Sequence, residues 1–312
     1  MTLQIARFSK GDTIKWNDFV NTARNGLFLF NRYYMEYHED RFTDHSLMVF
    51  RENKLVGVFP ANEKNNSIWS HEGLTFGGIL LSKDLRGTDT IEVLGLIMQY
   101  YKGLGFHEIY YKAIPYIFHS YPCQEDLYAL FRQGALLYRR DISSVVALSD
   151  PIRFSETKRQ NISKCIKAGA VFSENRNFGE YWELLKIVLA KFDASPVHTI
   201  TEINSLHQKF PDKIRLFEAR LSGELLAGIV IYDYNTVVHT QYMATSLKGR
   251  NIGALDFING NLIEGEFKNR TYYSFGISTV QGGGVLNEGL IQQKEMMGGR
   301  AVVNDFYKIQ LK

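Results

Sequence analysis

The sequence predicts an α/β protein with two similar mixed-sheet domains in tandem, residues 1–150 and 151–312. Three observations support this prediction. The 312 residues fit two domains of about 150 residues better than a single core. The expected order of elements, β-α-α-β-β-β-α-β-α-β-β, occurs once on each side of Asp150-Pro151. Proline cannot donate to a sheet ladder and restricts the residue before it, so this dipeptide marks the boundary.

In the first half, β-branched and aromatic runs alternate with segments whose apolar residues recur at helical spacing. A loop with three glycines, His71-Glu-Gly-Leu-Thr-Phe-Gly-Gly78, separates the early strands from the longest helix. The expected strands are 3–8, 46–51, 54–63, 67–70, 108–112, 136–141 and 144–148, and the expected helices are 14–23, 31–38, 88–104 and 124–133.

The second half begins with a basic helix at 155–168, which we interpret as a solvated helix packed on its domain rather than a nucleic-acid contact. The expected strands that follow are 170–174, 214–220, 225–233, 237–245, 271–275, 300–303 and 306–310. The expected helices are 181–192, 201–209, 254–267 and 286–297.

Composition excludes several classes of protein. Hydrophobic residues make up 45% and charged residues 22%, as in ordinary globular proteins. The net charge of +3 is too small for a dedicated nucleic-acid binder. Cys123 and Cys165 have neither disulfide nor metal-ligand spacing, so we expect no metal site and a reducing, cytoplasmic location. We expect neither a signal peptide nor a membrane span, because no apolar run is long enough.

The strongest local signal is the strand 237–245 followed by a short basic segment and then a helix from Ala254. The free N–H groups and the positive dipole end of a helix start bind anions, and glycine lets the backbone approach phosphate closely. We therefore expect a donor-binding loop over 248–253. Its expected cofactor-binding residues are Lys248, Gly249, Arg250, Asn251, Gly253 and Ala254. An ordinary turn between strand and helix is the alternative.

The order of elements, with a phosphate-type loop between the fourth strand and the third helix, resembles the GNAT acyltransferase fold, the acyl-CoA N-acyltransferase fold. Doubled in one chain, it resembles the Fem-type aminoacyltransferases and GNAT-like proteins of bacterial polysaccharide loci. The stretches that carry the resemblance are Arg159–Ala170, Tyr273-Ser-Phe-Gly-Ile-Ser-Thr279, Gln293-Lys-Glu-Met-Met-Gly-Gly299, Pro196-Val-His-Thr199 and Ser70–Gly78. Ser274 replaces the usual Asp, and Gln293 and Met297 replace Phe. The last helix also lacks the tyrosine that often protonates a leaving thiolate.

The resemblance implies an acyltransferase that moves an acetyl or longer acyl group from coenzyme A to an amine. The expected acceptor is a small molecule that carries an amine. It would be an amino sugar or another cell-envelope precursor, in which the amine can be linked to a sugar. One alternative is a Fem-type peptidyltransferase that uses aminoacyl-tRNA, so tRNA is a possible partner. Another is a non-catalytic module that binds a nucleotide sugar. The sequence leaves the oligomeric state open.

Acyl transfer needs a nucleophile with its proton removed, donors for the developing oxyanion, and a positioned donor. The candidate catalytic residues are His239, His198, Tyr242 and Lys294. Backbone N–H groups near the end of strand 237–245 are the candidate hydrogen-bond donors to the oxyanion. Strand alternation places His239 and Gln241 on one face and Tyr242 on the other, unless a bulge intervenes. A sheet histidine and a solvated helix-end lysine are the structural alternatives for His239 and Lys294.

The expected substrate-binding residues come from both halves. The first half, which lacks Lys or Arg in its glycine loop, is predicted to be a degenerate copy that holds the acceptor, and the second half carries the donor loop. The residues are Tyr37, Arg41, His71, Gln241, Ser278 and Thr279. A glycine-rich turn beside a core histidine is the alternative for His71.

Overall fold

The computed structural model describes residues 2–311, which form two compact units. Unit 1 contains the residues up to Asp141, Gln281–Val285 and the residues from Val303 on. Unit 2 contains Ile142–Val280 and Leu286–Val302. The predicted ranges 1–150 and 151–312 differ from these units at their ends. The difference arises because strands β9 (Leu136–Ala147) and β17 (Arg300–Gln310) each contribute residues to both units.

Unit 1 contains two sheets. The first has the order β1-β3-β4-β7, formed by Leu3–Arg7, Leu47–Arg51, Lys54–Phe59 and Leu80–Leu81. The second runs β17-β8-β6-β5-β2, in which β8 is Glu108–Lys112, β6 Ser67–Trp69, β5 Asn62–Lys64 and β2 Thr43–Asp44. The helices are α1 (Thr13–Thr22), α2 (Arg32–Met35), α3 (Gly87–Gly103) and α4 (Glu125–Arg132), with 3-10 turns η1 (Lys10–Asp12), η2 (Phe28–Phe30), η3 (Glu36–Arg41) and η4 (Tyr116–Phe118).

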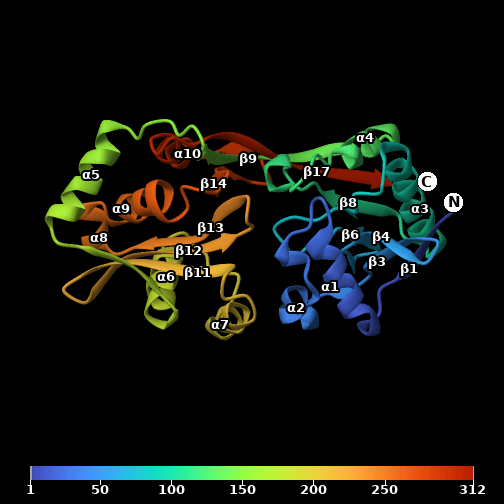
Figure 1. Cartoon of the computed structure of the whole chain (residues 1–312), viewed down its shortest axis with the longest axis horizontal. Helices are drawn as coiled ribbons and strands as arrows, with labels where there is room; N and C mark the ends of the chain where they lie inside the picture. The colour runs from blue at the N-terminus through green and yellow to red at the C-terminus, as the bar shows by residue number, and fades with distance from the viewer. Residues whose placement is uncertain (1, 312) are drawn as a thin grey trace. The chain divides into compact units, whose positions relative to one another are not determined.

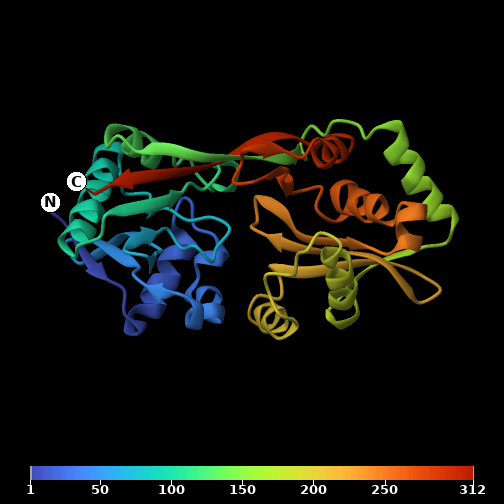
Figure 2. The ribbon, with the colours of Figure 1, turned by 180° about the vertical axis from the view of Figure 1, so that it is seen from behind.

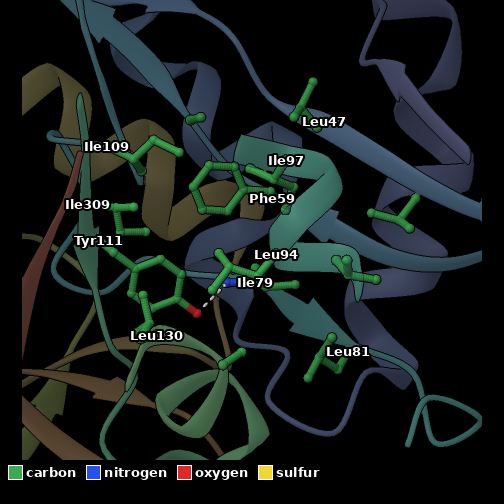
Figure 3. Close-up of a cluster of buried hydrophobic side chains, with 14 of the residues drawn as sticks. Leu47, Phe59, Ile79, Leu81, Leu94, Ile97, Ile109, Tyr111, Leu130 and Ile309 are labelled. Carbon is green, nitrogen blue, oxygen red and sulfur yellow. Dashed lines mark hydrogen bonds between the residues drawn. The ribbon is translucent and has the colours of Figure 1, made fainter. Parts of the chain in front are cut away.

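The core of unit 1 forms where the apolar stripe of α3 meets the strands (Figure 3). Val93, Leu94 and Ile97 recur at helical spacing and are fully buried. The Tyr111 hydroxyl accepts the Ile79 N–H at 3.0 Å and donates to Asp126 at 2.6 Å. Burial raises the pKa of Asp126 to about 6. The hydroxyl therefore gives the buried Ile79 N–H its partner and adds one to the buried Asp126 carboxylate.

Unit 2 contains one mixed sheet with the order β10-β11-β12-β13-β14-β9. Its strands besides β9 are β10 (Val171–Asn175), β11 (Ile214–Leu221), β12 (Glu224–Asp233), β13 (Val237–Thr245) and β14 (Tyr272–Ile277). Helices α6 (Gly179–Ala190) and α7 (Ile200–Lys209) cover one face and α9 (Ala254–Asn261) covers the other (Figure 1). The helix α5 (Glu156–Lys167) lies beside α8 (Leu247–Ile252) and α9, as Figure 2 shows from behind.

Local sequence explains most of these elements. The β3–β4 turn places Glu52 and Asn53 at positive φ, and the β11–β12 turn does so with Ser222 and Gly223, as tight hairpins require. Helix α7 begins with a capping box, in which the Thr199 side chain accepts the Glu202 N–H while the Glu202 carboxylate accepts the Thr199 N–H. The predicted basic helix α5 packs Cys165 and Ile162 against unit 2.

Several predicted elements differ from the structure in detail. The segments 136–141 and 144–148 form the single strand β9, and 300–303 and 306–310 form the single strand β17. Both are long because each continues from one unit into the other. The helix expected at 254–267 ends at Asn261, and a π-helical turn, η5 (Leu262–Glu266), follows. Helix α10 (Glu288–Glu295) is shorter than predicted, starting at the cap Asn287.

Each unit contains one parallel strand pair in its main sheet. In unit 2, β13 pairs with β14 through three residue pairs, Val237 to His239 against Tyr272 to Ser274. In unit 1, β6 pairs with β8 through three residue pairs, Ser67 to Trp69 against Glu108 to Tyr110. The strand beyond each pair is antiparallel, β9 beside β14 and β17 beside β8. The two units therefore repeat the same strand arrangement. Strand β9 of the first half of the chain stands beside β14 of unit 2, and β17 of the second half stands beside β8 of unit 1.

Candidate active site

The parallel strands β13 and β14 separate within unit 2. Their pairing ends at His239 and Ser274, although β13 continues to Thr245 and β14 to Ile277. Close to this point β13 has a β-bulge: Val230 pairs with Tyr242 and Ile231 with Thr240, which leaves Gln241 as the extra residue. The extra residue of a bulge disrupts the ladder locally. The sheet therefore opens beside an irregular piece of backbone.

His239 lies where the two strands part. Its Nδ1 is 3.1 Å from the Ser274 hydroxyl, which also accepts the Gly276 N–H at 3.4 Å. Gly276 has a φ of +73°, and a Cβ there would lie 3.2 Å from the His239 ring. Burial, together with the nearby charge of Lys294, lowers the pKa of His239 to about 4. The imidazole is therefore neutral at physiological pH.

Lys294, on helix α10, holds the end of β14. Its ammonium donates to the Gly276 carbonyl at 2.9 Å, the Ile277 carbonyl at 2.6 Å and the Ser278 hydroxyl at 2.9 Å. The side chain is buried, and burial lowers its pKa to about 8. The three ammonium hydrogens match these three acceptors in number. Lys294 is thus a buried clamp rather than a solvated helix-end lysine.

His198 and Tyr242 form a second pair. The His198 Nδ1 is 2.6 Å from the Tyr242 hydroxyl, and the Tyr242 ring packs edge-to-face on Trp182 of α6, with centroids 5.3 Å apart. Burial raises the pKa of Tyr242 to about 12, so the phenol is neutral. The contacts of this pair are with α6 and the loop before α7, whereas those of His239 are with β14 and α10. The four predicted catalytic residues therefore form two groups.

The other predicted residues of unit 2 are distributed around the strand ends. Ser278 is buried and bonded to Lys294, and its N–H donates to the Ile142 carbonyl of β9 at 2.8 Å. Thr279 follows it in the short strand β15 (Thr279–Val280), which pairs with β16 (Val285–Leu286). Gln241 is the bulge residue and is partly exposed. Of this set, Gln241 and Ser278 lie at the point where the strands part.

The loop expected at 248–253 is wrong, because these residues form helix α8 and its C-terminal turn. The Ser246 side chain caps this helix by accepting the Gly249 N–H at 3.0 Å, and Gly253 ends it at a φ of +79°. Lys248 forms an ion pair with Glu224, and the Asn251 carbonyl accepts from Lys164 at 2.7 Å. Arg250 is exposed, and Ala254 is buried.

The start of α9 is also occupied by protein. A Cβ on Gly253 would lie 2.6 Å from the Asn161 Cβ and 3.0 Å from its Cα, so α5 approaches this backbone closely. Asp256, in the first turn of α9, accepts from Lys158 at 2.7 Å and from Asn161 at 2.7 Å. An acidic side chain already complements the positive end of this helix. The donor-binding role of 248–254 stays a prediction, for which this geometry offers no open anion site.

In unit 1, the predicted substrate residues lie around η3. The ring of Tyr37 contacts that of His38 with centroids 4.1 Å apart, and His38 contacts His71 at 5.3 Å. Arg41, the last residue of η3, is exposed. His71 is buried and has a φ of +59°. Tyr37 and His71 therefore belong to one aromatic cluster, and their substrate-binding role stays a prediction.

No protein-family model matches this sequence, and no curated protein matches it either. Solved structures do match its fold over almost its whole length. A structure of FemX is 12% identical, with a TM-score of 0.69 over 98% of this chain and 96% of that one. L-PGS from Bacillus licheniformis is 13% identical, with a TM-score of 0.65 over 96% and 92%. A tandem GNAT protein from the clavulanic acid biosynthesis pathway is 9% identical, with a TM-score of 0.53 over 100% and 99%.

The chain has a tandem GNAT-like fold. This finding confirms the predicted fold class and the resemblance to tandem GNAT-like, Fem-type proteins. At such low identity the likeness extends to the fold alone. Within residues 2–311, no helix is both long and apolar enough to cross a membrane. In the same residues, no three His, Cys, Asp or Glu side chains gather in a way that could hold a metal ion.

The sequence analysis did not single out three residues of this candidate site. Ser274 was noted only for replacing an Asp, yet its hydroxyl lies against His239. Position 276 requires glycine, because its φ is positive and because a Cβ there would lie close to the His239 ring. Trp182, in the predicted helix 181–192, packs edge-to-face on the Tyr242 ring. The signal available for Gly276 was its place in the Ser274-Phe-Gly276 strand end, where a glycine interrupts a β-branched and aromatic run.

The lowered pKa of His239 predicts a pH dependence of stability. Above its ordinary pKa of 6.5, His239 is neutral in both the folded and the unfolded chain. As the pH falls from 6.5 to about 4, the unfolded chain binds a proton that the folded one does not, so stability is lost. The variant His239→Gln should lose up to roughly 3 kcal/mol less unfolding free energy than the parent when the pH falls through this range. Urea unfolding at pH 7 and pH 4.5 checks it, with exposed His107→Gln as control. An identical acid loss in parent and His239→Gln contradicts the assignment.

Proposed function

We propose that this chain transfers an acyl or aminoacyl group from an activated donor to an amine, where β13 and β14 part. The observation that carries the proposal is the β-bulge at Gln241 beside the end of the parallel pairing. Acyl transfer passes through a tetrahedral oxyanion, which preorganised N–H donors stabilise strongly in a site shielded from water. We assign the backbone N–H of Gln241 as the donor in this role.

Lys294 and His239 support this site in different ways. Lys294 fixes the Gly276 and Ile277 carbonyls, so its role in this proposal is to position the strand end. A general base works best when its pKa is near the working pH, and burial places that of His239 at about 4. We therefore assign His239 to orienting the incoming amine through a hydrogen bond rather than to removing its proton.

Two donors fit the proposal. Acyl-coenzyme A is the first, with its pyrophosphate near the predicted residues 248–254. Aminoacyl-tRNA is the second. The observation that favours it is that helix α8, the Lys248–Glu224 pair and the packing of Gly253 on Asn161 leave no open loop for a pyrophosphate. The acceptor we propose is the amine of an amino sugar or another cell-envelope precursor, modified in the cytoplasm where both donors are made.

The test is single-turnover transfer with each donor. The full chain is incubated with acetyl-coenzyme A or with a mixture of aminoacyl-tRNAs, and glucosamine or a nucleotide-linked amino sugar is the acceptor. We expect an amide product from one donor only. The double variant Lys248→Glu, Arg250→Glu should weaken acetyl-coenzyme A binding at least about tenfold if phosphate binds there, whereas Lys268→Glu, an exposed lysine elsewhere in unit 2, should not. Sugar binding without transfer from either donor would contradict the proposal and support the non-catalytic module.

A further inference from the structure

Unit 1 contains a cavity of about 220 Å³ that the proposed transfer does not use. It is lined by residues of β1, η1, α2, η3 and β2 and by His71 of the glycine loop. Aromatic rings and charged side chains of both signs make up its wall.

Arg32 forms a fixed polar surface in this cavity. Its guanidinium is almost fully buried and donates to Asp44 at 2.8 Å, to Glu36 at 3.4 Å and to the Ser46 hydroxyl at 3.3 Å. It also stacks over the Phe8 ring at 3.8 Å from the centroid. A guanidinium held between two carboxylates and an aromatic face keeps one orientation. The carboxylates keep further lone pairs that can accept hydrogen bonds from a ligand.

The charges of the wall balance one another. Arg32 is matched by Asp44 and Glu36, and Lys10 and Glu39 form an exposed pair 2.9 Å apart at the rim. Arg7 donates to the Asp44 backbone carbonyl at 2.6 Å. Three cations thus stand beside three carboxylates. An ion that entered would meet a like charge beside every opposite one, so this wall suits a ligand without net charge.

His71 supplies an unused polar atom. Its side chain is 4% exposed, and its Nδ1 is buried without a hydrogen-bond partner. Burial and the nearby charges of Lys112 and Arg32 keep its pKa well below the ordinary value, so the ring is neutral. A buried polar atom without a partner is destabilising unless something else satisfies it. In a neutral ring this atom suits a hydroxyl group.

The backbone around His71 is held in place against strain. A φ of +59° is unfavourable for a residue with a Cβ. The buried ammonium of Lys112 donates to the carbonyls of His71 at 3.1 Å, Glu72 at 3.0 Å and Leu74 at 2.6 Å. Strain of this kind persists where the surroundings enforce it, commonly at ligand sites. The clamp therefore keeps the imidazole at the cavity wall.

We propose that this cavity binds one uncharged sugar ring. The volume is below the roughly 300–1,000 Å³ of drug-sized sites, which excludes a nucleotide and suits a single hexose. The carboxylates of Glu36 and Asp44 accept hydrogen bonds from its hydroxyl groups, and His71 and Arg32 complete the polar contacts. Phe42 offers an apolar face for the C–H face of the ring. The proposal rests on unit 1 alone and is independent of the proposed transfer.

The test is ligand binding to the full chain without any donor, so its outcome is separate from that of the transfer assay. Saturation-transfer NMR with methyl glucoside and N-acetylglucosamine should show saturable binding with a Kd near 1 mM. The variants His71→Asn, chosen because asparagine tolerates positive φ, and Glu36→Gln should each weaken it at least about fivefold. Their matched controls, His107→Asn and Glu92→Gln, alter exposed residues of unit 1 and should not.

Two results would overturn the inference. One is the absence of saturable binding of either sugar to a parent protein that is folded by its unfolding curve. The other is binding of inorganic phosphate that His71→Asn weakens and salt abolishes, since the cavity would then be an anion site. If Glu36→Gln lowers the stability of the chain, the sugar affinity of His71→Asn alone tests the inference. Asparagine can keep the positive φ of position 71.

Discussion

Replacing Lys294→Ala is expected to slow single-turnover transfer about 100-fold, the effect of misplacing a reacting group by about an ångström. The ammonium fixes the Gly276 and Ile277 carbonyls and the Ser278 hydroxyl. Without it, the strand end beside His239 loses its position. The loss should appear in the rate at saturating donor more than in donor affinity, because the clamp does not contact the donor. Leaving buried acceptors unpaired should also lower the unfolding free energy by about 3 kcal/mol.

The control for this variant is Lys268→Ala, which removes an exposed lysine of the same unit. Unfolding curves at the assay temperature show whether the variant is folded, so that lost activity is not lost protein. Lys294→Met, which keeps the apolar stem, should recover part of the stability but not the rate. An unchanged rate with only a raised Michaelis constant would make Lys294 a binding residue and contradict its role as a clamp.

Replacing Gly253→Ala is expected to destabilise the chain by about 2–4 kcal/mol. Gly253 has a φ of +79°, which costs about 1–2 kcal/mol for a residue with a Cβ. The new methyl group would also lie 2.6 Å from the Asn161 Cβ and 3.0 Å from the Asn161 backbone. Because backbone cannot turn away as a side chain can, α5 would have to shift from α8 and α9. Urea unfolding measures the change.

The matched control is Gly265→Ala, since a Cβ at Gly265 would meet nothing within 4 Å. That variant should be neutral or slightly stabilising, because alanine lowers the entropy of the unfolded chain. A stable Gly253→Ala that fails only to bind a phosphate-bearing donor would show that this glycine serves the donor. That result would support the predicted donor-binding role of residues 248–254.

Local patterns predicted the fold well. Strand β13 has the predicted ends, Val237 and Thr245, because its β-branched and aromatic residues are unbroken. The local residues also explain the cap of α7, at Thr199 and Glu202, and the turn at Ser222-Gly223. The prediction of a loop at 248–253 is wrong because Ser246 caps a short helix there. This helix forms because it packs against α5 and β12, and the glycines do not determine it. The continuity of β9 and β17 depends on partners far away in sequence.

The candidate site was only partly predictable for the same reason. The resemblance places Lys294 near the bound donor or acceptor, where it would stabilise negative charge. Its contacts with the end of β14 could not be predicted, because the three acceptors lie 16 to 18 residues earlier and depend on the tertiary fold. Strand alternation correctly raised the question of a bulge in β13, without locating it at Gln241. The pKa of His239 depends on burial and on Lys294, neither of which the local sequence determines.

The backbone N–H of Gln241 can be tested directly. Gln241→Ala keeps that N–H and removes the side chain, whereas Gln241→Pro removes the N–H itself. Single-turnover transfer with the donor that the parent uses should stay within about threefold in Gln241→Ala and fall about 100-fold or more in Gln241→Pro, the usual effect of losing one oxyanion donor. Unfolding curves confirm that both variants are folded. Equal rates in the two folded variants would contradict the assignment of acyl transfer to the opening between β13 and β14.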